Sequence, residues 1–226
     1  MTRHFTNALS NLQSMLGTMS AYAEGALRLS GKAVAELSRS IATEVIAGDT
    51  KLDTMEIQIE EECLKILALH QPVASDLRQV ITILKINNEL ERIGDLAVNM
   101  AELVENLDSF SDSSIEKMDF SEMLQAACGM VKDALDSLAY HNVTLAQEVI
   151  ARDEKVDTIH SDNHGVVRDL ILKYPAYTQY YLNGLIISRC LERVADIATN
   201  IAEDVIYLES GRIVRHRHNM ENSNAS

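Results

Sequence analysis

A thirteen-residue motif occurs twice in this chain, and the duplication constrains the fold more than any other feature. The first copy spans residues 90–102 and the second spans residues 191–203, which is 101 residues later. Eight of the thirteen positions are identical, and every acidic residue is retained. A motif of this length that recurs at this distance predicts that the two halves of the chain share one fold.

Each copy has the pattern of an amphipathic helix. At about 100° per residue, the acids and the asparagine of a copy fall within a sector roughly 80° wide, and apolar residues cluster on the opposite side. This acidic stripe therefore points away from the core face of its own helix. Its members are Glu91, Asp95, Asn99 and Glu102 in the first copy, and the second copy keeps them as Glu192, Asp196, Asn200 and Glu203.

A second stretch is also repeated, and it adds more acids. Residues 44–54 match residues 148–158 at eight of eleven positions. The retained positions include the acidic pairs Asp49/Asp53 and Asp153/Asp157. If each pair lies beside the motif of its own half, four carboxylates converge in each half.

Convergent carboxylates point to cation binding. Carboxylates four residues apart on a helix repel each other by a few tenths of a kcal/mol, yet both copies keep them while apolar neighbours vary. Oxygen ligands without thiolates suit magnesium, manganese or ferric iron, and zinc and nickel also accept such ligands. The predicted metal ligands are Asp49, Asp53, Glu91, Asp95, Asn99, Asp153, Asp157, Glu192, Asp196 and Asn200.

Other readings of these residues remain open from the sequence. A charged helix face is commonly just solvated. Asp49 and Asp153 also fit helix N-caps, and the two asparagines fit backbone caps. In the second half Asp157, His160 and His164 lie near one helical face, a spacing that also suits zinc.

Hydrophobic periodicity and turn signals predict six helices. The residues expected to end or start helices include Gly48, Asp49 and Pro72, and a Ser/Asp-rich stretch follows residue 107. The expected helices span residues 5–47, 49–71, 76–106, 116–152, 153–173 and 178–208. The prediction is an all-α fold of two pseudo-repeated three-helix bundles with up-down connectivity. The first bundle is residues 1–107, the linker 108–115, the second bundle 116–210 and a mobile polar tail 211–226.

Composition narrows the classes of function. A formal net charge of −14 disfavours nucleic acid and anionic membranes, which need clustered Lys and Arg. Cys63, Cys128 and Cys190 are widely spaced and odd in number, so we expect buried, reduced thiols and no disulfide framework. No secretory h-region and no run of eighteen apolar residues occurs, which predicts a cytoplasmic protein.

At these residues the chain resembles the PhoU family of phosphate-uptake regulators. The resemblance rests on the doubled Glu-x-x-x-Asp motif with an asparagine one turn later, on the junction acids, and on Asp76-Leu77-Arg78 ahead of the first motif. The second half has Tyr177-Thr178-Gln179 at the position equivalent to this tripeptide, so the basic residue is not doubled. The resemblance covers the chain up to about Ser210.

The resemblance implies a cytoplasmic, homodimeric, non-enzymatic regulator that binds multinuclear metal clusters. Its implied partners are the ATPase subunit of a phosphate ABC transporter and a sensor histidine kinase, and its implied role is to restrain the phosphate-starvation response. Two alternatives remain at this stage. One is a carboxylate-bridged oxidase or metal-handling protein, which the absence of any Glu-x-x-His disfavours. The other is an adaptor whose acids meet basic patches on a partner.

Overall fold

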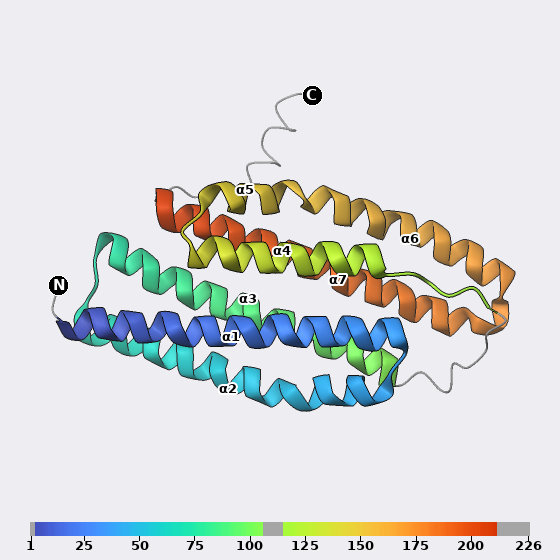
Figure 1. Cartoon of the computed structure of the whole chain (residues 1–226), viewed down its shortest axis with the longest axis horizontal. Helices are drawn as coiled ribbons and strands as arrows, with labels where there is room; N and C mark the ends of the chain where they lie inside the picture. The colour runs from blue at the N-terminus through green and yellow to red at the C-terminus, as the bar shows by residue number, and fades with distance from the viewer. Residues whose placement is uncertain (1–2, 106–114, 212–226) are drawn as a thin grey trace, which may run out of the picture.

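The structure is a computed structural model, and it describes residues 3–105 and 115–211. Over these residues the chain folds into seven α-helices and one short 3-10 helix, with no strand (Figure 1). The elements are α1 (Arg3–Glu36), α2 (Arg39–His70), α3 (Ala74–Glu105), α4 (Ser121–Ala139), α5 (Val143–Ala151), α6 (Asp153–Lys173), η1 (Pro175–Tyr177) and α7 (Thr178–Ser210). The predicted all-α fold class is confirmed.

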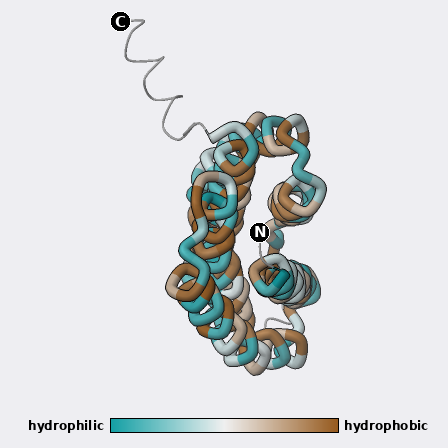
Figure 2. Tube along the Cα trace, turned by 90° about the vertical axis from the view of Figure 1, so that its left-hand side faces the viewer, coloured by the Kyte–Doolittle hydropathy of each residue, from teal (hydrophilic) through white to brown (hydrophobic). Residues whose placement is uncertain are grey.

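The helices form two similar bundles of three rods. In the first half α1, α2 and α3 pack against one another. In the second half α4 and α7 are two of the rods, and α5 followed by α6 makes the third (Figure 1). Hydrophobic and hydrophilic residues alternate around each helix, as expected for amphipathic helices in a bundle (Figure 2).

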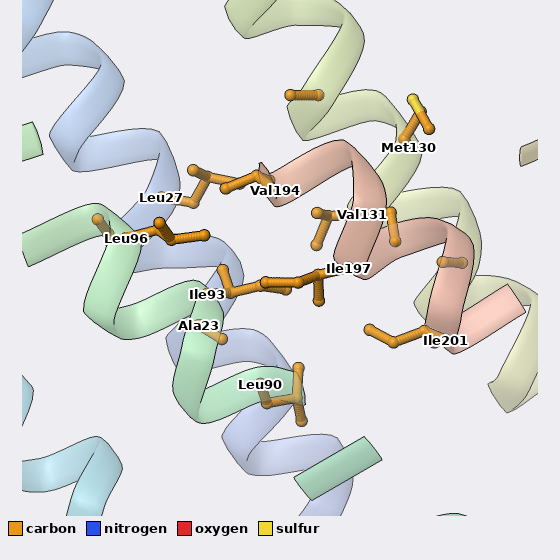
Figure 3. Close-up of a cluster of buried hydrophobic side chains, with 14 of the residues drawn as sticks. Ala23, Leu27, Leu90, Ile93, Leu96, Met130, Val131, Val194, Ile197 and Ile201 are labelled. Carbon is orange, nitrogen blue, oxygen red and sulfur yellow. The ribbon is translucent and has the colours of Figure 1, made fainter. Parts of the chain in front are cut away.

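The two bundles share a core where α3 packs against α7. One cluster of buried apolar side chains includes residues from both halves. Ile93 of α3 and Ile197 of α7 are fully buried and lie side by side at its centre (Figure 3). Ala23 and Leu27 of α1 contribute from the first half, and Val131 of α4 contributes from the second (Figure 3).

Polar contacts also join α3 to α7. Lys85 Nζ lies 3.2 Å from Oδ1 of the buried Asp204. Further along, the Asn200 amide donates a hydrogen bond to Glu89 Oε1 at 3.4 Å. Because the partners advance along α3 while they recede along α7, the two helices are antiparallel. Each acidic motif therefore lies near the middle of the contact between the bundles.

The predicted boundary at Gly48 and Asp49 is wrong. Helix α2 runs through both residues, and α1 ends twelve residues earlier, at Glu36. The turn is made by Leu37, which adopts a left-handed backbone with φ of 51°, and by Ser38, which precedes α2. A glycine inside a helix costs about 1 kcal/mol, and the packing of α2 on its neighbours outweighs that cost.

The predicted helix over residues 116–152 is also wrong. The structure has α4 and α5 there, separated by a turn at residues 140–142. His141 has φ of 52°, and the Asn142 side chain caps α5 by accepting a hydrogen bond from the Leu145 amide at 3.1 Å. This turn is equivalent to the one at Leu37 and Ser38, since both lie 104 residues apart in the repeat. The predicted break at Arg152 is confirmed as the junction of α5 and α6.

The remaining helices agree with the prediction to within a few residues. Helices α3, α6 and α7 match the expected ranges, and the break at Tyr174 and Pro175 is the 3-10 turn. Cys63, Cys128 and Cys190 are free, and two of them are buried as expected, whereas Cys128 is half-buried. In the described parts of the chain, no helix has both the length and the apolarity needed to cross a membrane.

The domain boundaries stay a prediction. The linker expected at residues 108–115 lies outside the described residues except for Ile115, which is buried. The tail expected at residues 211–226 also lies outside them except for Gly211.

Candidate metal centre

The first half brings its predicted ligands together across α2 and α3. Asp49 and Asp53 lie in the interior of α2, and Glu91 and Asp95 lie on α3. Asp49 and Glu91 are half-buried, whereas Asp53 and Asp95 are exposed. The set therefore lines a junction between two helices that solvent reaches. We call these four acids the first acidic site. The predicted ligand Asn99 is exposed and lines a hollow with Arg189 and Arg193.

Gly94 explains how α2 and α3 come this close. A methyl group on Gly94 would overlap the Leu52 side chain and would lie 3.9 Å from Asp49 Oδ1. Leu52 is buried over this glycine. The missing side chain in the middle of the motif thus lets α2 approach and places Asp49 beside the motif acids.

Electrostatics confirm that these carboxylates share one environment. Burial raises the pKa of Asp49, and the nearby charges of Asp53 and Asp95 raise it further. Burial likewise raises the pKa of Glu91, with added repulsion from Asp95 and from Glu56 of α2. The native fold therefore holds several like charges against their mutual repulsion.

The second half repeats this arrangement across α6 and α7. Asp153 and Asp157 lie on α6, and Glu192 and Asp196 lie on α7. Their burial follows the first half position by position, since Asp153 and Glu192 are half-buried and the other two are exposed. These four acids form the second acidic site, whereas the predicted ligand Asn200 donates a hydrogen bond to Glu89 of α3 at 3.4 Å.

Asp153 is the most perturbed carboxyl of the second acidic site. Burial, followed by repulsion from Asp157 and Asp196, raises its pKa to about 6. Its Oδ1 atom is buried and makes no hydrogen bond within the described residues. The nearby Thr199 hydroxyl offsets part of the rise in the pKa of Asp153. Thr199 Oγ1 and Asp153 Oδ1 nevertheless do not meet the geometry of a hydrogen bond.

Helix capping does not account for the junction acids. Asp49 is ten residues inside α2, and α6 begins at Asp153 with no side chain capping its start. The orphaned Asp153 oxygen in particular lacks the backbone amide that a capping carboxylate accepts from. An oxygen of this kind needs a proton, a cation or an ordered water, because a buried unpaired charge is costly.

The α3–α7 contact brings arginines of one half close to acids of the other. Burial and Asp157 raise the pKa of Asp196, whereas Arg92 of α3 and Arg193 lower it. A surface hollow of about 310 Å³ lies between α3 and α7, where Asn99 and Glu102 meet Arg189 and Arg193. Arg92 of the first half therefore contributes to the electrostatic environment of the second acidic site.

The donor set of each acidic site fits a hard cation. Its carboxylate oxygens are ligands that magnesium, manganese and ferric iron prefer. Among the described residues, no three carboxylates, imidazoles or thiolates stand ready around one point. Binding would require the exposed carboxylates, such as Asp95 and Asp196, to turn toward their half-buried neighbours.

The structure adds residues that the sequence prediction missed. Glu56 also belongs to the first acidic site. Burial, Glu60 and Asp53 raise the pKa of Glu56, and the charge of Glu56 adds to the rise in the pKa of Glu91 that burial and Asp95 cause. Thr199 sits beside Asp153 in the second. Glu56 was detectable in principle, because it lies one turn after Asp53 on the same helix face. Thr199 carried no such signal, since the first copy has Val98 at the equivalent position.

The histidines proposed as a zinc alternative lie on α6 beyond Asp157. His160 is half-buried and its ring packs edge-on against that of the exposed His164, with 5.0 Å between centroids. His160 Nδ1 lies 2.9 Å from the hydroxyl of the buried Ser188. His160 is thus fixed to α7 rather than free at the surface.

Comparison with known proteins supports these repeats. The PhoU domain family matches residues 16–104 and 120–205, so each matched stretch contains one acidic motif. A phosphate-specific transport system accessory protein PhoU from Serratia marcescens is 33% identical over 216 residues, covering 94% of this chain and 87% of that protein. A PhoU homolog from Pseudomonas aeruginosa is 34% identical over 215 residues, covering 95% and 89%.

Solved structures show the same fold. The crystal structure of PhoU from Pseudomonas aeruginosa superposes with a TM-score of 0.86 at 33% identity, covering 92% of this chain and all of that one. The phosphate transport system regulatory protein PhoU from Streptococcus pneumoniae superposes with a TM-score of 0.78 at 25% identity, covering 93% and 99%. The similarity therefore extends through both bundles.

Proposed function

The chain belongs to the PhoU family, and we propose that it is a non-enzymatic accessory protein that regulates phosphate uptake and restrains phosphate-starvation signalling. The observation that carries this proposal is the pair of equivalent acidic sites, one in each PhoU domain. Its relatives over nearly the whole chain are accessory proteins of phosphate-specific transport. That breadth supports the transfer of the role to this chain.

In this proposal each acidic site holds a metal cluster. Asp49, Asp53, Glu91, Asp95 and Asn99 hold one, and Asp153, Asp157, Glu192, Asp196 and Asn200 hold the other. A bound cation supplies positive charge that neutralises the clustered carboxylates. The protein contributes half-buried acids that fix position and exposed acids that close over the ion. Iron, manganese, magnesium, zinc and nickel all accept such ligands.

The proposed partners follow from the family role. A regulator of uptake must contact the transporter, so we assign the ATPase subunit of the phosphate ABC transporter and a sensor histidine kinase as partners. The bundles have no catalytic constellation in our assignment, and the protein acts in the cytoplasm as a homodimer. Metal at the exposed rim of each acidic site would place cation charge where a partner surface meets it.

The proposal is tested in a bacterium from which its own PhoU protein has been deleted. We expect this chain to restore repression of a phosphate-starvation reporter in phosphate-rich medium. The double variant Asp95→Asn/Asp196→Asn is expected to lose that repression at equal protein level. The matched control is Asp169→Asn, which removes an exposed carboxylate of α6 outside both sites.

Two outcomes would contradict the proposal in different ways. If the unchanged chain fails to restore repression while its level matches that of the deleted protein, the regulatory role is wrong. If the double variant represses as well as the control, the acidic sites do not carry that role.

A further inference from the structure

A second group of potential ligands lies outside both acidic sites, around Ser188 of α7. Its hydroxyl is fully buried and lies 2.9 Å from His160 Nδ1. The Asn163 amide donates a hydrogen bond to the same oxygen at 2.9 Å. The hydroxyl in turn reaches Met123 Sδ of α4 at 3.5 Å. Three helices therefore fix the position of the His160 ring.

The contacts of Ser188 define two arrangements for His160. A serine hydroxyl has one proton to donate and two lone pairs to accept with, and Asn163 occupies one lone pair. The proton goes either to His160 Nδ1 or to Met123 Sδ. When it goes to Met123 Sδ, the remaining lone pair accepts from His160 Nδ1–H, and Nε2 of the neutral ring is unprotonated. Metal-binding histidines have this arrangement, because they donate the other ring N–H to a fixed acceptor.

His164 supplies a second imidazole one turn away. Residues four apart on a helix share a face, and the two ring centroids are 5.0 Å apart. Burial, together with His164 and Arg189, lowers the pKa of His160, while Asp157 acts in the opposite direction. Two imidazoles at this separation suit zinc, nickel or copper(II).

The first half differs at each equivalent position. Glu56 takes the place of His160 and Glu60 takes the place of His164 in the repeat. Asn87 takes the place of Ser188, and its amide donates to the Glu56 backbone oxygen at 3.0 Å. The two halves thus keep a polar anchor on α3 or α7 but exchange carboxylates for imidazoles.

We infer that His160 and His164 form a cation site of their own, selective for borderline divalent ions such as zinc, with Ser188 as the residue that positions His160. Water completes the coordination in this assignment, because only two protein ligands stand ready. The inference does not depend on the proposed regulatory function. It predicts that the two halves of the protein differ in the cations they take.

The test uses the full chain with His216→Gln and His218→Gln, because the His-x-His sequence of the tail would also bind zinc. Zinc chloride and magnesium chloride are titrated separately while the imidazole nitrogens are followed by 15N NMR. Before zinc is added, we expect the His160 signals of the Nδ1–H tautomer. Zinc at one equivalent is expected to shift Nε2 of His160 and the ring of His164, and magnesium is not.

Substitutions separate ligands from the positioning residue. His160→Gln and His164→Gln are each expected to weaken zinc binding at least tenfold, and Ser188→Ala is expected to weaken it about tenfold and to change the His160 tautomer. His141→Gln is the control, since that histidine pairs with Glu209 elsewhere. A His160 ring protonated on Nε2, or zinc that leaves the ring signals of His160 and His164 unshifted in the folded chain, would overturn the inference.

Discussion

At the scale of single residues, burial and mutual repulsion of the carboxylates in the acidic sites destabilise the native state, and a bound cation or a proton relieves that destabilisation. Asp153 shows this most clearly, because its buried oxygen has no partner and its neighbours carry like charge. A carboxyl whose pKa rises on folding disfavours the native state wherever it is ionised. Such strain is retained at functional sites more often than at structural ones.

The first prediction concerns the pH dependence of stability. The pKa of Asp153 rises from about 3.8 to about 6 on folding. The native state therefore binds the proton more tightly, so the penalty is absent below pH 4, grows between pH 4 and 6 and is complete at pH 7. In chelator, Asp153→Asn is expected to raise the free energy of unfolding at pH 7 by about 1–2 kcal/mol, allowing for solvent screening.

Urea unfolding at pH 4, 5, 6 and 7 measures this effect. The gain from Asp153→Asn should shrink as the pH falls through 6 toward 4. Asp169→Asn, on the same helix but exposed, should change stability by less than about 0.5 kcal/mol at every pH. A gain that is absent at pH 7, or that grows in acid, would contradict the assignment.

The second prediction concerns the close approach at Gly94. The first half pairs Gly94 with Leu52, and the repeat has Ala195 and Val156 at the equivalent positions. The larger Ala195 in place of glycine is thus matched by a smaller Val156 in place of leucine. Gly94→Ala gains about 1 kcal/mol of helix propensity but overpacks against Leu52 by about 1–3 kcal/mol. We expect a net loss of stability in the natural chain. In the Leu52→Val background the same change should be neutral or stabilising.

A double-mutant cycle by urea unfolding checks this coupling. The account predicts that Gly94→Ala is at least about 1 kcal/mol more favourable beside Val than beside Leu at position 52. Equal effects in the two backgrounds would show that Gly94 and Leu52 do not set the spacing of α2 and α3.

At the scale of the helices, the connections place non-glycine residues in left-handed backbone. Leu37, Gln71, Ala74 and His141 all have positive φ. Left-handed backbone costs a residue with a β-carbon roughly 1–2 kcal/mol. These costs are met by the packing of long helices, which buries far more surface than a turn does.

The third prediction concerns Gln71, the exposed C-cap residue that directly follows α2. Its φ is 45°, and its amide bonds to the Leu67 carbonyl in the manner of a helix C-cap. Gln71→Gly is expected to raise the free energy of unfolding by about 0.5–1 kcal/mol, because glycine accepts this conformation without steric cost. Gln58→Gly, in the exposed interior of α2, should instead lower it by about 1 kcal/mol. Thermal or urea unfolding of both variants tests the contrast, and a loss at position 71 would refute it.

The turns also explain where sequence reasoning failed. Periodicity predicted that the chain is helical throughout, and it located α3 and α7 well because Pro72 and Pro175 mark their approaches. The α1–α2 turn was misplaced because Leu37 carries no turn signal and Gly48 carries a false one. Alignment of the two repeats would have located this turn. Asn142 is a good N-cap residue, and the residue 104 positions earlier is Ser38, which precedes α2.

The candidate site was more predictable than the turns. The acids of α2 and α3 were expected to converge, and the structure brings Asp49 and Asp53 beside Glu91 and Asp95 although it moves the helix boundary. Repetition made this possible, because identical acids in two copies identify positions without any knowledge of helix ends. The arginines that cross from one half to the other, such as Arg92 near Asp196, depend on how α3 packs on α7, which periodicity does not encode.

At the scale of the whole molecule, the antiparallel contact of α3 and α7 unites two copies of one bundle. It places both motifs near the centre of the protein and makes a shared core of Ile93 and Ile197 (Figure 3). An ion pair between Lys85 of α3 and Asp204 of α7 also joins the two helices.

The central claim is that the two acidic sites hold metal, and metal content per chain tests it most directly. The full chain and the Asp95→Asn/Asp196→Asn variant are purified identically without chelator and measured by elemental analysis. The account predicts at least one tightly held metal ion in the natural chain and a clear loss of metal in the folded double variant. A natural chain that holds no metal, or a double variant that holds as much as the natural chain, would contradict it.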